Sequence, residues 1–107
     1  MREKNIQRLI DIPDYVLNDI NIYCTKYNIS INHFMNIAVI NNLSDELTSI
    51  KITKKTHMVP TRVRIRESAY QKIKDCTSKC NISMQKLILH CILEELEKFK
   101  NSTLINI

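Results

Sequence analysis

The sequence predicts a mainly α fold in which two copies of a strand-helix-helix unit form an intrachain pseudo-dimer through a two-stranded antiparallel ribbon. Three observations lead to this prediction. The 107 residues include no glycine and only two prolines, so few positions break a helix. A shift of 53 positions lays residues 8–43 on residues 61–96 without a gap. Each copy has a short alternating stretch, typical of a half-buried strand, before two stretches with helical spacing.

The two copies agree in their apolar positions and share a turn. Residues 26–30 read Lys-Tyr-Asn-Ile-Ser, and residues 79–83 read Lys-Cys-Asn-Ile-Ser. Self-similarity at a fixed period indicates copies of one supersecondary unit. We therefore expect a first repeat at residues 1–43 with a short N-terminal arm, a connector at residues 44–60, and a second repeat at residues 61–107 with a short tail. Both repeats are expected to form one compact domain.

The first part of each copy has apolar residues at alternate positions. Val63 and Ile65 alternate with three arginines, and residues 9–13 read Leu-Ile-Asp-Ile-Pro. Period-two alternation places the apolar side chains on one face of a strand. A lone strand leaves its backbone groups unpaired. The connector spans up to roughly 55 Å when extended, so it can bring strand 61–66 antiparallel to strand 8–13.

The second and third parts of each copy are amphipathic helices separated by the Asn-Ile-Ser turn. We expect Asn28 and Asn81 to adopt the left-handed conformation that ends a helix where glycine is missing. Ser30 and Ser83 are placed to cap the helices that follow. The residues expected to face the core share helical spacing: Val16, Ile20, Tyr23, Tyr27, Ile31, Phe34, Met35 and Ala38 in the first copy, and Ala69, Ile73, Cys76, Cys80, Met84, Leu87, Ile88 and Cys91 in the second.

The charge balance favours a polyanionic partner. The net charge is +5, and residues 61–107 contribute nine positive and five negative charges to it. Such a mild excess is compatible with nucleic acid but does not identify it. The N-terminus starts charged, and no stretch approaches 18 apolar residues, so we expect neither a signal peptide nor a membrane partner. These features predict a cytoplasmic protein, in the host cytoplasm if viral, with reduced cysteines.

The order and spacing of these parts resemble the ribbon-helix-helix DNA-binding proteins. The resemblance covers residues 8–43 and 61–96, about two-thirds of the chain, and the second copy matches better than the first. The arrangement is similar to tandem, single-chain members found on conjugative plasmids and in archaeal viruses. The resemblance implies a sequence-specific transcription regulator, such as a repressor, whose ribbon enters the major groove of double-stranded DNA.

Arginines on the outer face of that ribbon are the first candidates for reading bases. Arg62 and Arg64 lie on this face of the second copy, and Arg66 lies at the junction with the helix. The guanidinium fork matches the O6/N7 edge of guanine and also phosphate oxygens. The alternative is a solvated strand face, which explains Arg66 as well as DNA contact does.

The first copy carries different residues on the same face, namely Gln7, Leu9 and Asp11. Leu9 can touch a thymine methyl group, and Asp11 can accept a hydrogen bond from cytosine N4, although its charge repels phosphate. The alternative, which we favour, is that this strand reads little and mainly completes the fold. The DNA site is then asymmetric and dominated by the second copy.

The start of each second helix offers free backbone amides, a natural seat for phosphate, and the resemblance implies the same clamp. The candidate residues follow the two turns: Ser30, Ile31, Asn32, His33, Ser83, Met84, Gln85 and Lys86. Each serine is equally explained as an ordinary N-cap, and both roles can hold together. Weaker candidates for backbone contact lie in the connector, where a solvated linker explains them at least as well: Lys51, Lys54 and Lys55.

The cysteines suggest a zinc site only superficially. Cys76 and Cys80 are four residues apart, a spacing that can place two thiolates on one helix face. Under the shift, however, they align with Tyr23 and Tyr27, which are expected core positions. We therefore interpret the cysteines as core residues. We expect no catalytic residue, no metal and no cofactor, and thus no enzyme.

Two other functions use a similar chain. One is an accessory DNA-binding factor at a plasmid transfer origin. The other is an antitoxin-type interaction module, which works through a tail that wraps a partner. The expected tail after the last helix, residues 101–107, has only seven residues, and this argues against that function. Further copies of the chain would add to the intrachain pair, side by side on DNA, as a homo-oligomer.

Overall fold

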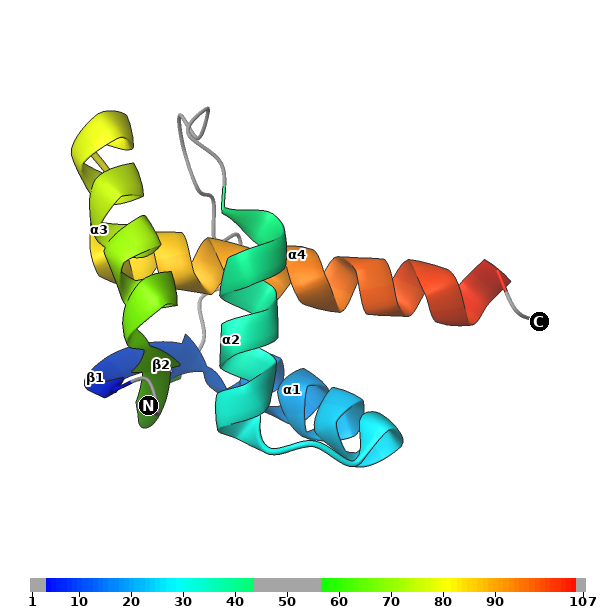
Figure 1. The fold of residues 1–107 in the computed structure, drawn as a ribbon. Helices are drawn as coiled ribbons and strands as arrows, with labels where there is room; N and C mark the ends of the chain where they lie inside the picture. The colour runs from blue at the N-terminus through cyan, green and yellow to red at the C-terminus, as the bar shows by residue number, and fades with distance from the viewer. Residues whose placement is uncertain (1–3, 44–56, 106–107) are drawn as a thin grey trace.

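The computed structural model describes residues 4–43 and 57–105. Its elements follow in the order β1 (Asn5–Pro13), α1 (Asp14–Tyr27), α2 (Ile31–Asn42), β2 (Met58–Arg66), α3 (Glu67–Cys80) and α4 (Met84–Ile105). Figure 1 shows the ribbon of β1 and β2 at one end of the domain, with α4 crossing α2 and α3. The helices bury one face of the ribbon and leave the other face exposed.

The ribbon is longer than the sequence predicts. β1 and β2 pair antiparallel, as expected, in a register that sets Asn5 opposite Arg66. Each strand begins three residues earlier than predicted. The reason is local, because Arg8 interrupts the apolar alternation of β1 and Pro60 lies within β2. Both residues weaken the strand signal without preventing the pairing.

The predicted fold class of two ribbon-helix-helix units is wrong. The described residues contain one two-stranded sheet, β1 with β2, and therefore one ribbon rather than two. Each half of the chain contributes a single strand, and a single strand cannot form a ribbon because its backbone groups need a partner. The observed architecture is one antiparallel ribbon packed against four helices.

The turns between the helices match the prediction. The Ser30 hydroxyl accepts a hydrogen bond from the backbone N–H of His33 at 3.0 Å, and the Ser83 hydroxyl accepts one from that of Lys86 at 3.2 Å. Both turn asparagines have the left-handed conformation, with φ of 54°: Asn28 and Asn81. These short segments fix where α2 and α4 begin relative to the ribbon.

The core draws side chains from the ribbon and all four helices. Its largest fully buried members are Ile12, Ile20, Phe34, Met35, Ile65, Ile73, Leu87, Ile88, Leu89 and Ile92. The core prediction is wrong for Tyr27, which is 51% exposed, and Ile31, Cys80 and Met84 are only half-buried. Tyr27 is the last residue of α1, and its ring lies against the edge of Phe99, 5.8 Å away between centroids.

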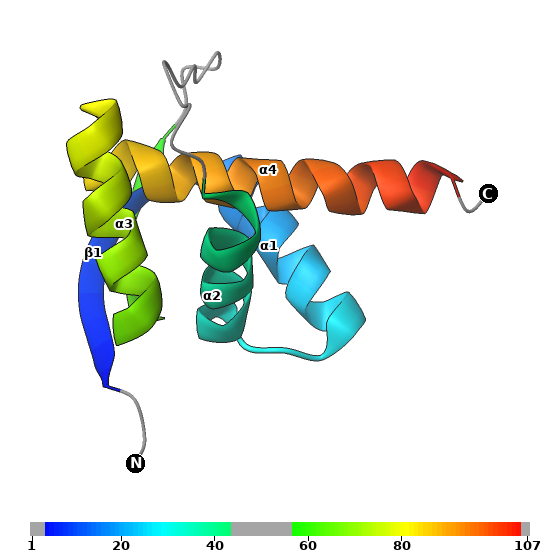
Figure 2. The same ribbon diagram turned by 45° about the horizontal axis from the view of Figure 1, so that its top comes forward.

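The C-terminal end of α4 packs on α1. Figure 2 shows α4 extending well past α2. The Phe99 ring lies 5.0 Å from that of Tyr23, and the Lys100 ammonium pairs with Asp19 at 3.0 Å. The expected seven-residue tail is therefore wrong, since helix α4 continues to Ile105. The apolar and charged contacts with α1 support this extension.

A polar network, buried at Tyr23 and Glu95, joins α1, α2 and α4. The Glu95 carboxylate accepts hydrogen bonds from the Tyr23 hydroxyl at 3.3 Å and from Asn42 Nδ2 at 3.1 Å. The Lys98 ammonium donates to Asn42 Oδ1 at 2.6 Å. Burial, reinforced by the neighbouring Glu95 charge, raises the pKa of Tyr23 to about 12. This network fixes the crossing of the helices above the ribbon.

Candidate nucleic-acid interface

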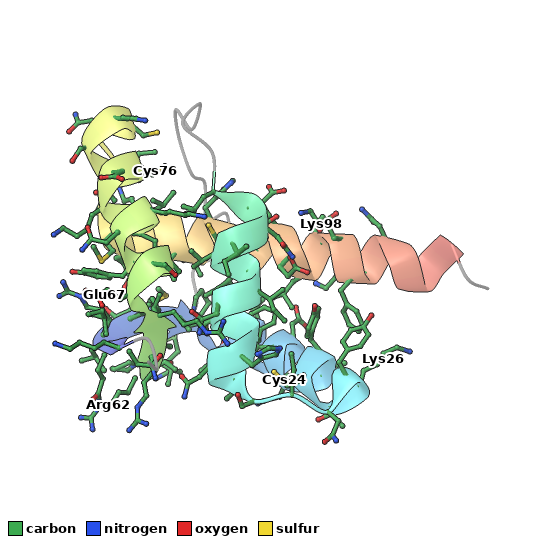
Figure 3. All side chains as sticks on the ribbon, in the orientation of Figure 1. Cys24, Lys26, Arg62, Glu67, Cys76 and Lys98 are labelled. Atoms are coloured by element: carbon green, nitrogen blue, oxygen red, sulfur yellow. The ribbon has the colours of Figure 1, made fainter. Side chains whose placement is uncertain are left out.

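The outer face of the ribbon brings together all six residues predicted to read bases. The cross-strand pairs on this face are Gln7 with Arg64, Leu9 with Arg62, Asp11 with Pro60, and Asn5 with Arg66. Every one of these side chains is exposed, and Leu9 has 66% of its surface open to solvent. Figure 3 shows the Arg62 side chain on the side of the ribbon turned away from the helices.

These outward pairs sit close together because of the ladder geometry. The backbone N–H groups of Arg64 and Arg66 donate to side chains of α2, so they point away from β1. Their pairs with β1 are therefore the non-hydrogen-bonded kind, in which facing side chains are closest. Pro60 lies an even number of residues from Arg64, so its backbone nitrogen also points away from β1. The absence of an N–H at Pro60 therefore removes no hydrogen bond between the two strands.

The charge is uneven along the ribbon. At one end, Arg64 and Arg66 face the neutral amides Gln7 and Asn5. At the other end, Asp11 faces Pro60, so among the strand residues that the structure describes, that end has no cation on its outer face. The two ends of the ribbon therefore present different chemistry, with the basic end formed by the C-terminal half of β2.

A polar groove adjoins the basic end. Its volume is about 280 Å³, and it is lined by Asn5, Ser30, Asn32, His33, Asn36, Arg64 and Arg66. The N-terminus of α2 opens here. The backbone amides of Ile31 and Asn32 precede the first intrahelical hydrogen bond, so they remain available to an anion. The groove thus combines two arginines, a histidine and a helix N-terminus.

The N-terminus of α4 meets the opposite end of the ribbon. The side chain of Gln85 accepts from the Asp11 N–H at 2.9 Å and donates to the Asp11 carbonyl at 2.6 Å. A hollow of about 140 Å³ here is lined by polar and apolar side chains alike: Arg8, Leu9, Ile10, Met84, Gln85 and Ile88. Lys86 follows on the exposed side of the helix. Of the arginines, Arg8 lines this hollow, whereas Arg64 and Arg66 lie at the other end of the ribbon.

Two predicted phosphate ligands use their side chains elsewhere. Asn32 Oδ1 accepts the Arg64 N–H at 2.9 Å, and Gln85 is bound to Asp11 as described. Both side chains hold the outer edge of a strand, where backbone groups otherwise lack partners. Their backbone amides remain as candidates for phosphate contact.

Three residues of this interface escaped the sequence prediction. Asn5 continues the outward alternation of Gln7 and Leu9, a signal that Arg8 obscured. Arg8 lies on the helix-facing side, where its guanidinium stands 5.0 Å from the Tyr70 ring centroid and hydrogen-bonds the Tyr70 hydroxyl. Asn36 is buried in α2 and bonds to β2. Its strand partner lies 30 residues away, so no local pattern marks it.

The connector lysines are not placed. Lys51, Lys54 and Lys55 lie outside the described residues, as does most of the predicted connector 44–60. The end of that connector belongs to β2, which starts at Met58.

Three of the four cysteines lie in the core, and Cys80 is only half-buried against it. Cys24, Cys76 and Cys91 are buried, and Cys76 Sγ lies 3.8 Å from Cys80 Sγ. Burial raises the pKa of Cys91 to about 12 and also raises that of Cys24, which disfavours the thiolate that binds metals. Across residues 4–43 and 57–105, no group of three or more His, Cys, Asp or Glu side chains is arranged to hold a metal.

The chain has no match among protein-family models, curated proteins or solved structures. Within the part of the chain that the structure describes, no helix is both long and apolar enough to cross a membrane.

Proposed function

We propose that this protein is a sequence-specific, double-stranded DNA-binding regulator of transcription that inserts the β1–β2 ribbon into the major groove. One observation carries the proposal: three exposed arginines lie on the outer face of an isolated two-stranded ribbon, beside the N-terminus of a helix. A two-stranded ribbon fits the major groove, about 12 Å wide, where all four base pairs are distinguishable. The resemblance to ribbon-helix-helix proteins supports the same function.

The proposed base contacts follow from side-chain chemistry. Arg62 and Arg64 bind guanine O6/N7 edges, and Arg66 binds either a guanine or the adjoining phosphate. Gln7 binds adenine N6/N7, and Leu9 packs against a thymine methyl group. These assignments concentrate the polar contacts at one end of the ribbon.

The proposed backbone contacts lie on either side of the groove. A phosphate sits in the polar groove, on the amides of Ile31 and Asn32 and beside His33. A second phosphate approaches the start of α4 near Lys86. Because these contacts are electrostatic, they set the salt dependence of binding rather than its sequence preference.

Because the arginines cluster at one end, the preferred DNA site is proposed to be asymmetric. Asp11 at the other end repels phosphate and accepts at most a cytosine amino group. A palindromic site would place identical sequences against chemically different ends of the ribbon, which gives no benefit. This organisation differs from a symmetric dimer, which favours two equal half-sites.

The runner-up function, an accessory factor at a plasmid transfer origin, uses the same interface and differs only in where the site lies. Both are functions of a cytoplasmic protein. An antitoxin-type module is less well supported, because α4 continues to Ile105 and packs on α1 instead of leaving a long free segment before that residue.

The test is selection of duplexes from a randomised pool, followed by titration of the selected duplex and a scrambled one. The proposal expects the full chain to enrich an asymmetric duplex site and to prefer it clearly over the scrambled duplex. Arg62→Ala should reduce that preference. A chain that enriches no duplex, or binds both duplexes equally well, would refute it.

A further inference from the structure

Asn36 is a buried polar side chain beside the basic end of the ribbon. It lies in the middle of α2 and keeps only 8% of its surface exposed. Its Nδ2 donates to the Asn32 carbonyl at 2.8 Å and to the Arg64 carbonyl at 3.3 Å. Its Oδ1 accepts from the Arg66 N–H at 2.9 Å. Burying an amide is unfavourable unless it is hydrogen-bonded, and this amide is bonded on both sides.

The Asn36 amide takes the place of a third strand along the edge of β2. It accepts from the N–H of Arg66 and donates to the carbonyl of Arg64, as a neighbouring backbone would. Asn32 adds a bond from the Arg64 N–H to its Oδ1 at 2.9 Å. The two residues whose backbone is bound in this way, Arg64 and Arg66, are the arginines of the basic end. Their backbone is therefore held on the helix side as well as by β1.

The opposite edge of the ribbon is built differently. Under the 53-residue shift, Asn36 corresponds to Leu89, which is 1% exposed, and Asn32 corresponds to Gln85. Gln85 binds only Asp11 on that edge. The strand residue that corresponds to Arg66 under the same shift is Pro13, which has no backbone N–H, so an apolar side chain suffices at the Leu89 position. At position 36 the amide has a backbone N–H to bind, that of Arg66, and the edge of β2 is therefore held where the edge of β1 is not.

We propose that Asn36, assisted by Asn32, is a positioning residue that orients Arg64 and Arg66 for base discrimination while acting through the β2 backbone. This inference rests on the proposed DNA-binding function. A base contact needs the guanidinium fork held in one geometry, because discrimination depends on two simultaneous hydrogen bonds. A phosphate contact tolerates more motion. Loosening the β2 edge should therefore reduce specificity more than overall affinity.

The experiment compares Asn36→Leu with two other variants of the full chain. Asn36→Leu installs the residue found at the corresponding position 89. Asn32→Ala changes a half-buried residue and removes only the bond to the Arg64 N–H. This variant replaces Asn36→Leu in the comparison if Asn36→Leu does not fold. Gln85→Leu is the matched control, since it removes an edge contact at the acidic end. Each is titrated with the duplex selected by the wild-type chain and with a scrambled duplex.

Asn36→Leu should reduce the ratio of selected to scrambled affinity by about tenfold, because one bidentate arginine–guanine contact contributes discrimination of about this size. Asn32→Ala should reduce it less. In Asn36→Leu, scrambled-duplex affinity and the salt slope should stay within about twofold of wild type, because Asn36 makes none of the proposed phosphate contacts. Backbone hydrogen exchange should accelerate at Arg66 in Asn36→Leu and at Arg64 in Asn32→Ala, while that at Asp11 should not. Gln85→Leu should show the reverse exchange pattern and should reduce discrimination less than Asn36→Leu does.

The outcomes separate the two proposals. If the wild-type chain selects no duplex, the proposed function and this inference both fail. If it does select one and both asparagine variants fold yet retain full discrimination, this inference alone is wrong. Equal losses on the selected and scrambled duplexes would also overturn it, since they would indicate general structural damage.

Discussion

Replacing Arg64 by alanine should cost sequence preference with little effect on folding. Arg64 lies on the outer face opposite Gln7 and lines the polar groove, so its truncation removes no core contact. Exposed substitutions of this kind change stability by at most about 0.5 kcal/mol. One bidentate guanine contact contributes about 1–3 kcal/mol of discrimination. The affinity for the selected duplex should therefore fall by roughly five- to 150-fold, since about 1.4 kcal/mol corresponds to tenfold.

The assay is a titration of the selected and scrambled duplexes at several salt concentrations. Lys26→Ala is the matched control, because it removes the same charge at the far end of α1, away from the ribbon (Figure 3). A base contact predicts a loss confined to the selected duplex, whereas a phosphate contact predicts equal losses and a salt slope lower by about one unit. The assignment is wrong if Arg64→Ala affects binding no more than Lys26→Ala does.

Three further outcomes are expected. Lys86→Ala should weaken all duplexes about equally and lower the salt slope by about one unit; a sequence-dependent loss would contradict its placement beside phosphate. Phe99→Ala should lower the free energy of unfolding in urea by about 1–3 kcal/mol, because the half-buried ring packs on that of Tyr23; an unchanged midpoint would contradict the packing of α4 on α1. Stability should also decline with rising pH from about 9 to 12, because the folded state holds the protons of Cys91 and Tyr23 more tightly than the unfolded chain does. Tyr23→Phe should flatten the part of this decline above pH 10, as followed by urea titrations at each pH.

Local features of the fold could be predicted because short-range chemistry determines them. Asn28 and Asn81 end their helices in the left-handed conformation, and Ser30 and Ser83 cap the next ones. Each needs only its immediate neighbours, and the same turn occurs twice. The pairing of the strands was also predictable, since each strand lacks any other partner.

The errors arise where distant contacts override local patterns. Tyr27 fits an apolar stripe, yet it ends α1 and rests on the edge of Phe99, a residue of α4. The last turns of α4 depend on contacts with α1, which no local signal announces. The fold class of two ribbon-helix-helix units was also wrong, because the described residues form one ribbon with one strand from each half of the chain.

The residues of the candidate interface were predictable, but the distribution of charge along the ribbon was not. Alternation identified the outward residues of both strands. The register then decides which of them face each other, and it places Arg64 and Arg66 at one end with Asp11 at the other. The supporting role of Asn36 depends on a strand 30 residues away, so only the folded structure brings it into view.

The most direct test of the central claim is dimethyl sulfate footprinting on the selected duplex. The reagent methylates guanine N7 in the major groove and adenine N3 in the minor groove, so it reports which groove is occupied. Insertion of the ribbon predicts protection of guanine N7 within one side of the site, with protection at one guanine lost in Arg64→Ala. Protection of adenine N3 with guanine N7 fully reactive would contradict the account.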